Sequence, residues 1–407
     1  MEVIYKVCCG IDVHKKTLVA CMRKGRKKEI REFGGNTKDI RAMAAWLKSN
    51  DCELVAMEST SVYWKPLVNI FELEDINYIV INAKEYKNVP GRKTDVQDSE
   101  WISDLLRHGL LKSSFIPTRE QRELRDATRY RKSITQEKTR AVNRLHKMLE
   151  CANIKLSSVV SDIQGVSSKK LLAQVIENGG AISIEQVESL ITTKLSASKE
   201  ELAEALEGIV TPLQKFMMEE VISHIDALSQ NIAKMDAVIE AYMEGYLSEI
   251  EKLIEIPGIG LTSAQIILAE IGLDMNQFPT AGHLASWAGL SPGNNESAGK
   301  KKSGKSRKGN QILKSTLVQS AKTAVKNKQS FYYAQYQRLA VKRGKNRATV
   351  AVAHSMLIAI YHILKNDKKF VDLGVDYYNQ FNTEKKANSY RKKLAALGYE
   401  VDLKKTG

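Results

Sequence analysis

The sequence has few cysteines and none of the spacings that bind structural metal ions. Its five cysteines are an odd number and include no CxxC pair and no Cys/His ligand spacing: Cys8, Cys9, Cys21, Cys52 and Cys151. These absences exclude a disulfide framework and a zinc finger as the basis of the fold. Most of the cysteines lie among apolar residues, so we expect reduced, buried thiols of a cytoplasmic protein.

The sequence also lacks long hydrophobic runs and is short of acidic residues. We find no apolar stretch long enough to span a bilayer and no signal peptide at the amino terminus. The 407 residues include 62 Lys and Arg but 47 Asp and Glu, which gives a net charge of +15 and a pI of about 9.3. This excess favours nucleic acid over a membrane surface as the partner, and a cytoplasmic, nucleoid-associated location.

Residues 1–112 carry the pattern of an α/β domain. The opening segment VIYKVCCGIDVHKKTLVACMRKG predicts two strands of a hairpin, and KEIREFGG predicts a third. Helical and apolar-strand patterns then alternate through TKDIRAMAAWLKSN, CELVAME, SVYWKPLVNIFELED, INYIVIN and TDVQDSEWISDLLRHGLL. Three strands followed by alternating helix and strand predict a mixed sheet covered by helices.

Acidic residues follow the ends of two of the predicted strands and begin the last helix. Asp12 ends the first strand, Glu58 ends the strand ELVAME, and Asp95 and Asp98 lie three apart on one helical face. Taken alone, the last two are explained as an ordinary pair on a surface helix, with Asp95 placed to favour the helix dipole. Together, however, four such carboxylates would repel one another unless cations lie between them, which predicts Mg²⁺, as two ions about 4 Å apart. The order of elements and acids resembles the ribonuclease H-like fold of RuvC-type Holliday junction resolvases. We interpret the neighbouring His14 as an exposed strand-end residue.

Residues 113–250 are predicted to be long helices. One heptad series contains Met218, Ile225, Ile232 and Ile239, and a second contains Val221, Leu228, Met235 and Tyr242. These heptads predict a coiled coil that joins two chains. An antiparallel helical hairpin within one chain accounts for them equally well.

Residues 251–370 are predicted to form a mostly helical C-terminal domain, followed by a basic tail at 371–407. The segment IPGIG resembles a helix-hairpin-helix turn, whose glycines let backbone amides approach a phosphate. A plain helical turn fits the same spacing equally well. Beyond it, SPGNNESAGKKKSGKSRKGN combines Ser297 with a dense basic run. From spacing alone this is a solvated loop that contacts nucleic acid, because no local base activates the serine. The basic residues predicted to contact nucleic acid are Arg92, Lys93, Arg129, Arg131, Lys132, Lys300, Lys301, Lys302, Lys305, Arg307 and Lys308.

The segments GIDVHKKT, AMEST, KTDVQDSEWI, IPGIG and GLSPGNNESAGKKKSGKSRKGN, in this order and separation, resemble the transposases of the insertion sequence one-ten family. The resemblance implies DEDD-type recombinases guided by a noncoding bridge RNA. It implies that Ser297 is the nucleophile, with Ser303 and Ser306 as the nearest rivals, and that dimers pair into a tetramer on donor and target DNA. It implies that the catalytic metal ligands are Asp12, Glu58, Asp95 and Asp98.

Two other functions stay open at the level of sequence. A Holliday junction resolvase or other hydrolytic nuclease would use only the four acids and release free ends. A non-catalytic coiled-coil protein that binds nucleic acid would carry the same carboxylates as solvated surface groups.

Overall fold

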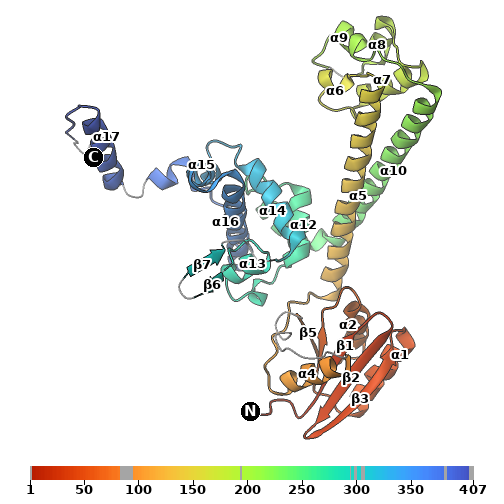
Figure 1. The fold of residues 1–407 in the computed structure, drawn as a ribbon, viewed down its shortest axis with the longest axis vertical. Coiled ribbons are helices and arrows are strands. Elements are labelled where there is room, and N and C mark those ends of the chain that lie inside the picture. The colour runs from red at the N-terminus through yellow and green to blue at the C-terminus, as the bar shows by residue number, and fades with distance from the viewer. Residues whose placement is uncertain are drawn as a thin grey trace. The chain divides into compact units, whose positions relative to one another are not determined.

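The structure, a computed structural model, describes residues 2–82, 95–192, 195–293, 295–297, 300–303, 308–379 and 383–402. The chain divides into two compact units, Met1–Glu120 and Gln121–Gly407. Each unit has its own sheet or helical core, and each is described by itself below (Figure 1).

The first unit is built on a five-stranded mixed sheet. The strands lie in the order β3-β2-β1-β4-β5, with β1 antiparallel to β2, β2 antiparallel to β3, and β1, β4 and β5 parallel. Their bounds are β1 Val7–Val13, β2 Thr17–Lys24, β3 Lys27–Gly34, β4 Leu54–Glu58 and β5 Tyr78–Ile81. The order along the chain, three strands and then alternating helix and strand, is the predicted one.

Helices cover both faces of this sheet (Figure 1). The helices α1 (Thr37–Ser49) and α2 (Trp64–Leu73) pack on the face that carries the odd-numbered residues of β1, such as Ile11. Pro66 lies in the first turn of α2, where its missing N–H has no partner within the helix, so it does not break the helix. The even-numbered residues of β1, such as Cys8, face α4 (Asp95–Arg107).

The second unit begins with a long antiparallel helix pair. The helices α5 (Arg119–Cys151) and α10 (Pro212–Tyr242) run antiparallel and share a core with four short helices at their far end (Figure 1). The short helices are α6 Leu156–Val159, α7 Val166–Glu177, α8 Ile184–Leu190 and α9 Lys199–Ala205. Several heptad residues, including Met218, Ile225 and Leu228, lie in the core that α10 shares with α5. The structure therefore shows the intrachain hairpin, and a coiled coil between chains stays a prediction.

The remaining helices form the C-terminal part of the second unit. Their bounds are η1 Glu244–Tyr246, α11 Leu247–Ile254, α12 Leu261–Ile271, η2 Met275–Gln277, α13 Ala281–Trp287, α14 Gln311–Ala324, α15 Phe331–Arg343, α16 Lys345–Asn366, η3 Val375–Asn379 and α17 Thr383–Ala396. Among the described residues, α16 is the one helix long and apolar enough to cross a membrane, a feature that the sequence analysis missed. Half of its most apolar stretch is buried inside the protein, as in the core helix of a folded domain.

The glycine turn between α11 and α12 has a packing role that was not predicted. Gly258 has φ +85°, and a Cβ there would lie 2.3 Å from the carbonyl oxygen of Ser320 on α14. Glycine is therefore required at 258 because the backbone of α14 crosses the turn and because φ is positive, while the approach of a phosphate to this turn stays a prediction. Gly260, the N-cap residue of α12, has open space around its Cα.

The cysteines are all free thiols, but only three of them are buried. Burial raises the pKa of Cys8 to about 11, and it also raises the pKa values of Cys9 and Cys21. Cys52 is half-buried and Cys151, at the end of α5, is exposed. The expectation that Cys151 is buried was wrong: it is the last residue of α5 and is exposed.

Candidate active site

Asp12 and Glu58 lie side by side at one edge of the sheet. The parallel register pairs Ile11 on β1 with Met57 on β4, so the next residues, Asp12 and Glu58, are neighbours at the strand ends. Both side chains belong to the sheet face that α4 covers, because Cys8 and Ala56 of the same alternation pack on that helix. Both residues are buried, with 4% and 7% of their surfaces exposed. The two strand ends therefore lie side by side at this edge, as predicted, and carry their acidic residues on the same face of the sheet.

Helix α4 lies unusually close to β1, and Gly10 makes this possible. A Cβ on Gly10 would lie 2.4 Å from the backbone nitrogen of Ser103 and 2.5 Å from the carbonyl oxygen of Ser99. The far end of α4 is held at the start of β1, where the Ile4 N–H donates to the carbonyl of Arg107 at 2.9 Å. The helix thus runs against the direction of β1, and its first turn lies at the strand end that carries Asp12.

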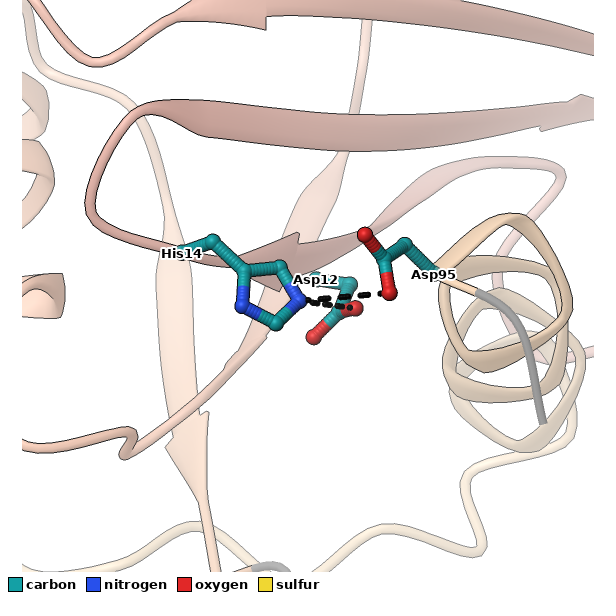
Figure 2. Close-up of side chains that lie close together, drawn as sticks. All are labelled: Asp12, His14 and Asp95. Carbon is teal, nitrogen blue, oxygen red and sulfur yellow. Dashed lines mark hydrogen bonds and ion pairs between the residues drawn. The ribbon is translucent and has the colours of Figure 1, made fainter.

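This arrangement brings Asp95, in the first turn of α4, to Asp12 and His14 (Figure 2). The Nε2 atom of His14 lies 3.1 Å from Oδ2 of Asp12 and 3.4 Å from Oδ1 of Asp95. One ligand atom from each of these three side chains lies within 4.8 Å of the others. Two carboxylates and an imidazole in this space are a reasonable ligand set for a divalent cation.

Burial, more than the neighbouring charges, destabilises the ionised form of Asp12. Burial raises the pKa of Asp12 most strongly, His14 lowers it, and the carboxylates of Asp95 and Asp98 raise it again. Carboxylates that compete in this way favour a cation between them. The residues therefore fit the divalent metal that the sequence predicts.

The close group differs from the predicted ligand set in its membership. Among the described residues it contains Asp12, His14 and Asp95 but neither Glu58 nor Asp98. Asp98 is half-buried one helical turn from Asp95, and its charge acts on Asp12. His14 was interpreted as an exposed strand-end residue; its side chain is 47% exposed, yet its ring faces both carboxylates. The signal that was available is its position two residues after Asp12, at the hairpin where the His14 N–H donates to Thr17.

The predicted serine loop contains a small β-hairpin. Its strands are β6 (Asn295–Ser297) and β7 (Lys300–Ser303), and Ser297 pairs with Lys300 across it. The structure describes the backbone of these strands but not their side chains, so the directions of the Ser297 hydroxyl and of Lys300, Lys301 and Lys302 lie outside the described part. Also outside it are Arg92, Lys93, Lys305, Ser306 and Arg307.

The chain that leaves this hairpin is anchored to the helical core. A Cβ on Gly309 would lie 2.4 Å from the backbone nitrogen of Gly289, so only glycine fits this contact. The side chain of Asn310 accepts from the Leu313 N–H at 3.0 Å, which caps α14, and its Nδ2 donates to Oε2 of Glu270 at 2.6 Å. The chain is therefore held against the helical core shortly after the hairpin.

Glu270 is a fully buried carboxylate that was not predicted as a functional or structural site. Its side chain is 0% exposed and accepts two hydrogen bonds from the Arg129 guanidinium, at 2.7 and 2.8 Å. Arg125 lies beside it and donates to the carbonyl of Ala269 at 3.1 Å. Burial lowers the pKa of Arg125 to about 10, although the charge of Glu270 opposes this shift. The hydrogen bonds that Arg129 donates to Glu270 raise the pKa of Arg129.

Three basic residues of α5 that were predicted to bind nucleic acid have partners inside the protein. Arg129 is paired with Glu270 as described. The Arg131 side chain is 4% exposed and donates to Asp236 at 2.9 Å and to Gln265 at 2.7 Å. Lys132 donates to Ser315 at 2.7 Å. Arg131 is therefore too buried to reach a phosphate in this structure. Lys308, which follows the hairpin in sequence, is exposed.

Two transposase family models match this chain. One, for the DEDD transposase of IS110, matches residues 9–154 and so includes the acidic site. The other, described as a transposase of the IS116/IS110/IS902 family, matches residues 250–337 and includes the serine hairpin. The chain belongs to the IS110 family of transposases.

Two curated proteins from bacterial insertion elements are similar to parts of the chain. The transposase for insertion sequence element IS1111A of Coxiella burnetii is 27% identical over 169 residues, which are 40% of this chain and 45% of that protein. An uncharacterized protein of insertion element IS110 from Streptomyces coelicolor is 37% identical over 102 residues, 24% of each chain. The matched part thus spans less than half the length of each relative.

Proposed function

We propose that this protein is a transposase that cuts and rejoins DNA in the excision and integration of an insertion sequence. The observation that carries the proposal is the approach of Asp12, His14 and Asp95 at the end of β1, within the residues that the DEDD transposase model matches. A resolvase that only hydrolyses DNA is the alternative with the same acids.

The acidic site suits Mg²⁺, with Asp12 and Asp95 as ligands and Glu58 and Asp98 beside them. Carboxylate oxygens are the ligands that Mg²⁺ prefers, and such a site holds one or two ions. When bound, the metal would stabilise negative charge on a phosphodiester. His14 would limit the freedom of Asp12 and Asp95, since its ring contacts both.

In the proposed reaction, the Ser297 hydroxyl attacks a DNA phosphorus. A phosphoserine ester forms, the bond from phosphorus to one DNA oxygen breaks, and that oxygen leaves as a hydroxyl after it takes up a proton. The phosphoserine link preserves a phosphate ester for rejoining, which simple hydrolysis does not. No histidine lies near Ser297 in sequence, so we propose that the proton goes to the acidic site of another protomer.

The proposed partners are DNA and a noncoding bridge RNA, which would choose the target by base pairing. The net charge of +15 supports the binding of two polyanions. We also propose that dimers pair into a tetramer, so that the serine and the acidic site are supplied by different protomers.

The test is a covalent adduct assay. Purified protein would be incubated with the element-end RNA, labelled junction DNA and Mg²⁺, and run on a denaturing gel before and after protease treatment. We expect an adduct that protease removes, lost in Ser297→Ala and in Asp98→Asn. Ser303→Ala on the same hairpin and Asp104→Asn on the same helix are the matched controls and should retain it.

Two results would favour the alternative functions. Free nicked ends, with Ser297→Ala still active, would show a resolvase and overturn the serine assignment. A non-catalytic binding protein would be favoured by two results together. The protein would bind nucleic acid without Mg²⁺, and no preparation that contains the correct RNA and DNA ends would show cleavage.

A further inference from the structure

The positive charge of this protein is concentrated in one stretch of sequence. Residues 297–366 contain 16 Lys and Arg and no Asp or Glu. The rest of the chain contains 46 basic and 47 acidic residues, which nearly cancel. The net charge of +15 therefore comes from this stretch, of which the serine hairpin is only the beginning.

Within this stretch, α15 and η3 enclose a basic hollow. It has a volume of about 280 Å³ and is lined by Gln335, Arg338, Leu339, Lys342, Arg343 and Tyr378. Arg338 and Lys342 lie four residues apart and so project from one face of α15. Three cationic side chains thus surround a space large enough for a phosphate group.

The cations of this hollow have no acidic partner among the described residues. Arg338, Lys342 and Arg343 are exposed, and none of them forms an ion pair within the parts of the chain that the structure covers. On the segment that leads into η3, Asp372 accepts hydrogen bonds from the N–H groups of Phe331 and Gly374 instead. The positive potential is therefore available to a ligand.

Aromatic packing holds the hollow in shape. The guanidinium carbon of Arg338 lies 4.8 Å from the centre of the Tyr378 ring, and that ring stacks on Phe331 at 5.4 Å and 23°. Tyr332, only 2% exposed, stacks on Phe370 and fixes the start of α15. An arginine that is already positioned loses less rotamer freedom when it binds.

We propose that this hollow, the Arg338 pocket, binds a backbone phosphate of nucleic acid away from the reacting phosphodiester. An arginine offers two parallel N–H donors to phosphate oxygens, and the two neighbouring cations add charge without reading a base. Arg338, Lys342 and Arg343 lie beyond residue 337, where the second family model ends. The inference rests on the proposed function only in its assumption that nucleic acid is the substrate.

The test measures binding rather than cleavage. The variant Arg338→Ala/Lys342→Ala/Arg343→Ala would be compared with the matched triple variant Lys147→Ala/Lys170→Ala/Lys234→Ala. The control removes three exposed charges from α5, α7 and α10 that form no ion pair with any residue that the structure describes. Fluorescence anisotropy would give Kd across a salt series for a labelled DNA duplex, its single strand and an RNA of the same sequence.

We expect the pocket variant to weaken binding and to reduce the slope of log Kd against log salt by about two to three. The control should keep the wild-type slope. A probe whose slope falls identifies the nucleic acid that the pocket holds, DNA or RNA. An unchanged slope for all three probes, or an equal fall in the control, would overturn the proposal.

Two variants distinguish a failure of the pocket proposal from a failure of the proposed function. Ser297→Ala should bind all probes as wild type does, whereas the pocket variant should still form the adduct at saturating DNA. Arg338→Lys keeps the charge but loses the planar donor pair, so it should recover the salt slope and only part of the affinity.

Discussion

The substitution Gly10→Ala tests whether the contact between α4 and β1 builds the acidic site. The added Cβ would lie 2.4 Å from Ser103 N and 2.5 Å from Ser99 O, both backbone atoms that cannot rotate away. Ordinary contacts at a Cβ begin at 3.4 Å, so α4 must move by about 1 Å. Asp95 and Asp98 belong to this helix and would move with it, away from Asp12.

We expect two effects of this size of displacement. Overpacking in a close contact typically costs about 1–3 kcal/mol of unfolding free energy, which a urea titration would measure. Displacement of reacting groups by about 1 Å can lower a rate about 100-fold, so adduct formation should fall by that order. Mg²⁺ affinity, measured by isothermal titration calorimetry, should fall as well, because its ligands come from both elements.

Gly245→Ala is the matched control, since no heavy atom lies within 4 Å of the Cβ position there. It should leave stability, Mg²⁺ affinity and adduct formation as in the wild type. If Gly10→Ala folds with unchanged stability and binds Mg²⁺ as tightly as the wild type, the closeness of α4 does not position the acids, and the reasoning fails.

Three further outcomes are expected. Glu270→Ala leaves Arg125, whose side chain is 12% exposed, without its buried acidic neighbour and should cost about 3–5 kcal/mol in a urea titration. The loss should be smaller for Glu270→Gln, and equal stability would mean that the buried acid is not needed. Iodoacetamide at pH 8 should label the exposed Cys151 first. Cys8 should react only as the pH rises toward its raised pKa of about 11, because the thiolate is the reactive form. Mass spectrometry of the peptides checks the order, and labelling of Cys8 before Cys151 would contradict it. Gly309→Ala should disturb the hairpin base and lower adduct formation without a comparable loss of DNA affinity, and a normal rate with a normal melting curve would refute the anchoring role.

The sheet and its acidic edge could be predicted because both depend on local pattern. Asp12 and Glu58 each follow an apolar run that predicts a buried strand. Because parallel strands end at the same edge of a sheet, the sequence predicts that these two residues are neighbours, and the register of β1 and β4 agrees. The role of His14 could not be predicted in the same way. Its ring contacts Asp95 across 81 residues of chain, and that approach depends on how closely α4 packs on Gly10.

The basic residues of α5 show where pattern fails. Arg129 and Arg131 lie on a long, highly charged helix and look solvated in sequence, but their partners come from α12 and α10. The available signal was Glu270 itself, a charge inside the apolar run IILAEIG. A buried carboxylate requires a cationic partner, and a charged helix elsewhere in the chain is the natural source.

The same comparison separates two uses of positive charge in this protein. On α5, Arg129 and Arg131 are neutralised by acids of neighbouring helices and contribute to stability. From Ser297 to Asn366 no acidic residue exists to neutralise the cations, and the described ones at Arg338, Lys342 and Arg343 gather around a preformed hollow. A folded domain gains no stability from unpaired like charges, which repel one another. Their retention in one segment is thus best explained by a polyanion that supplies the missing negative charge, and the salt dependence of binding should follow this segment rather than α5.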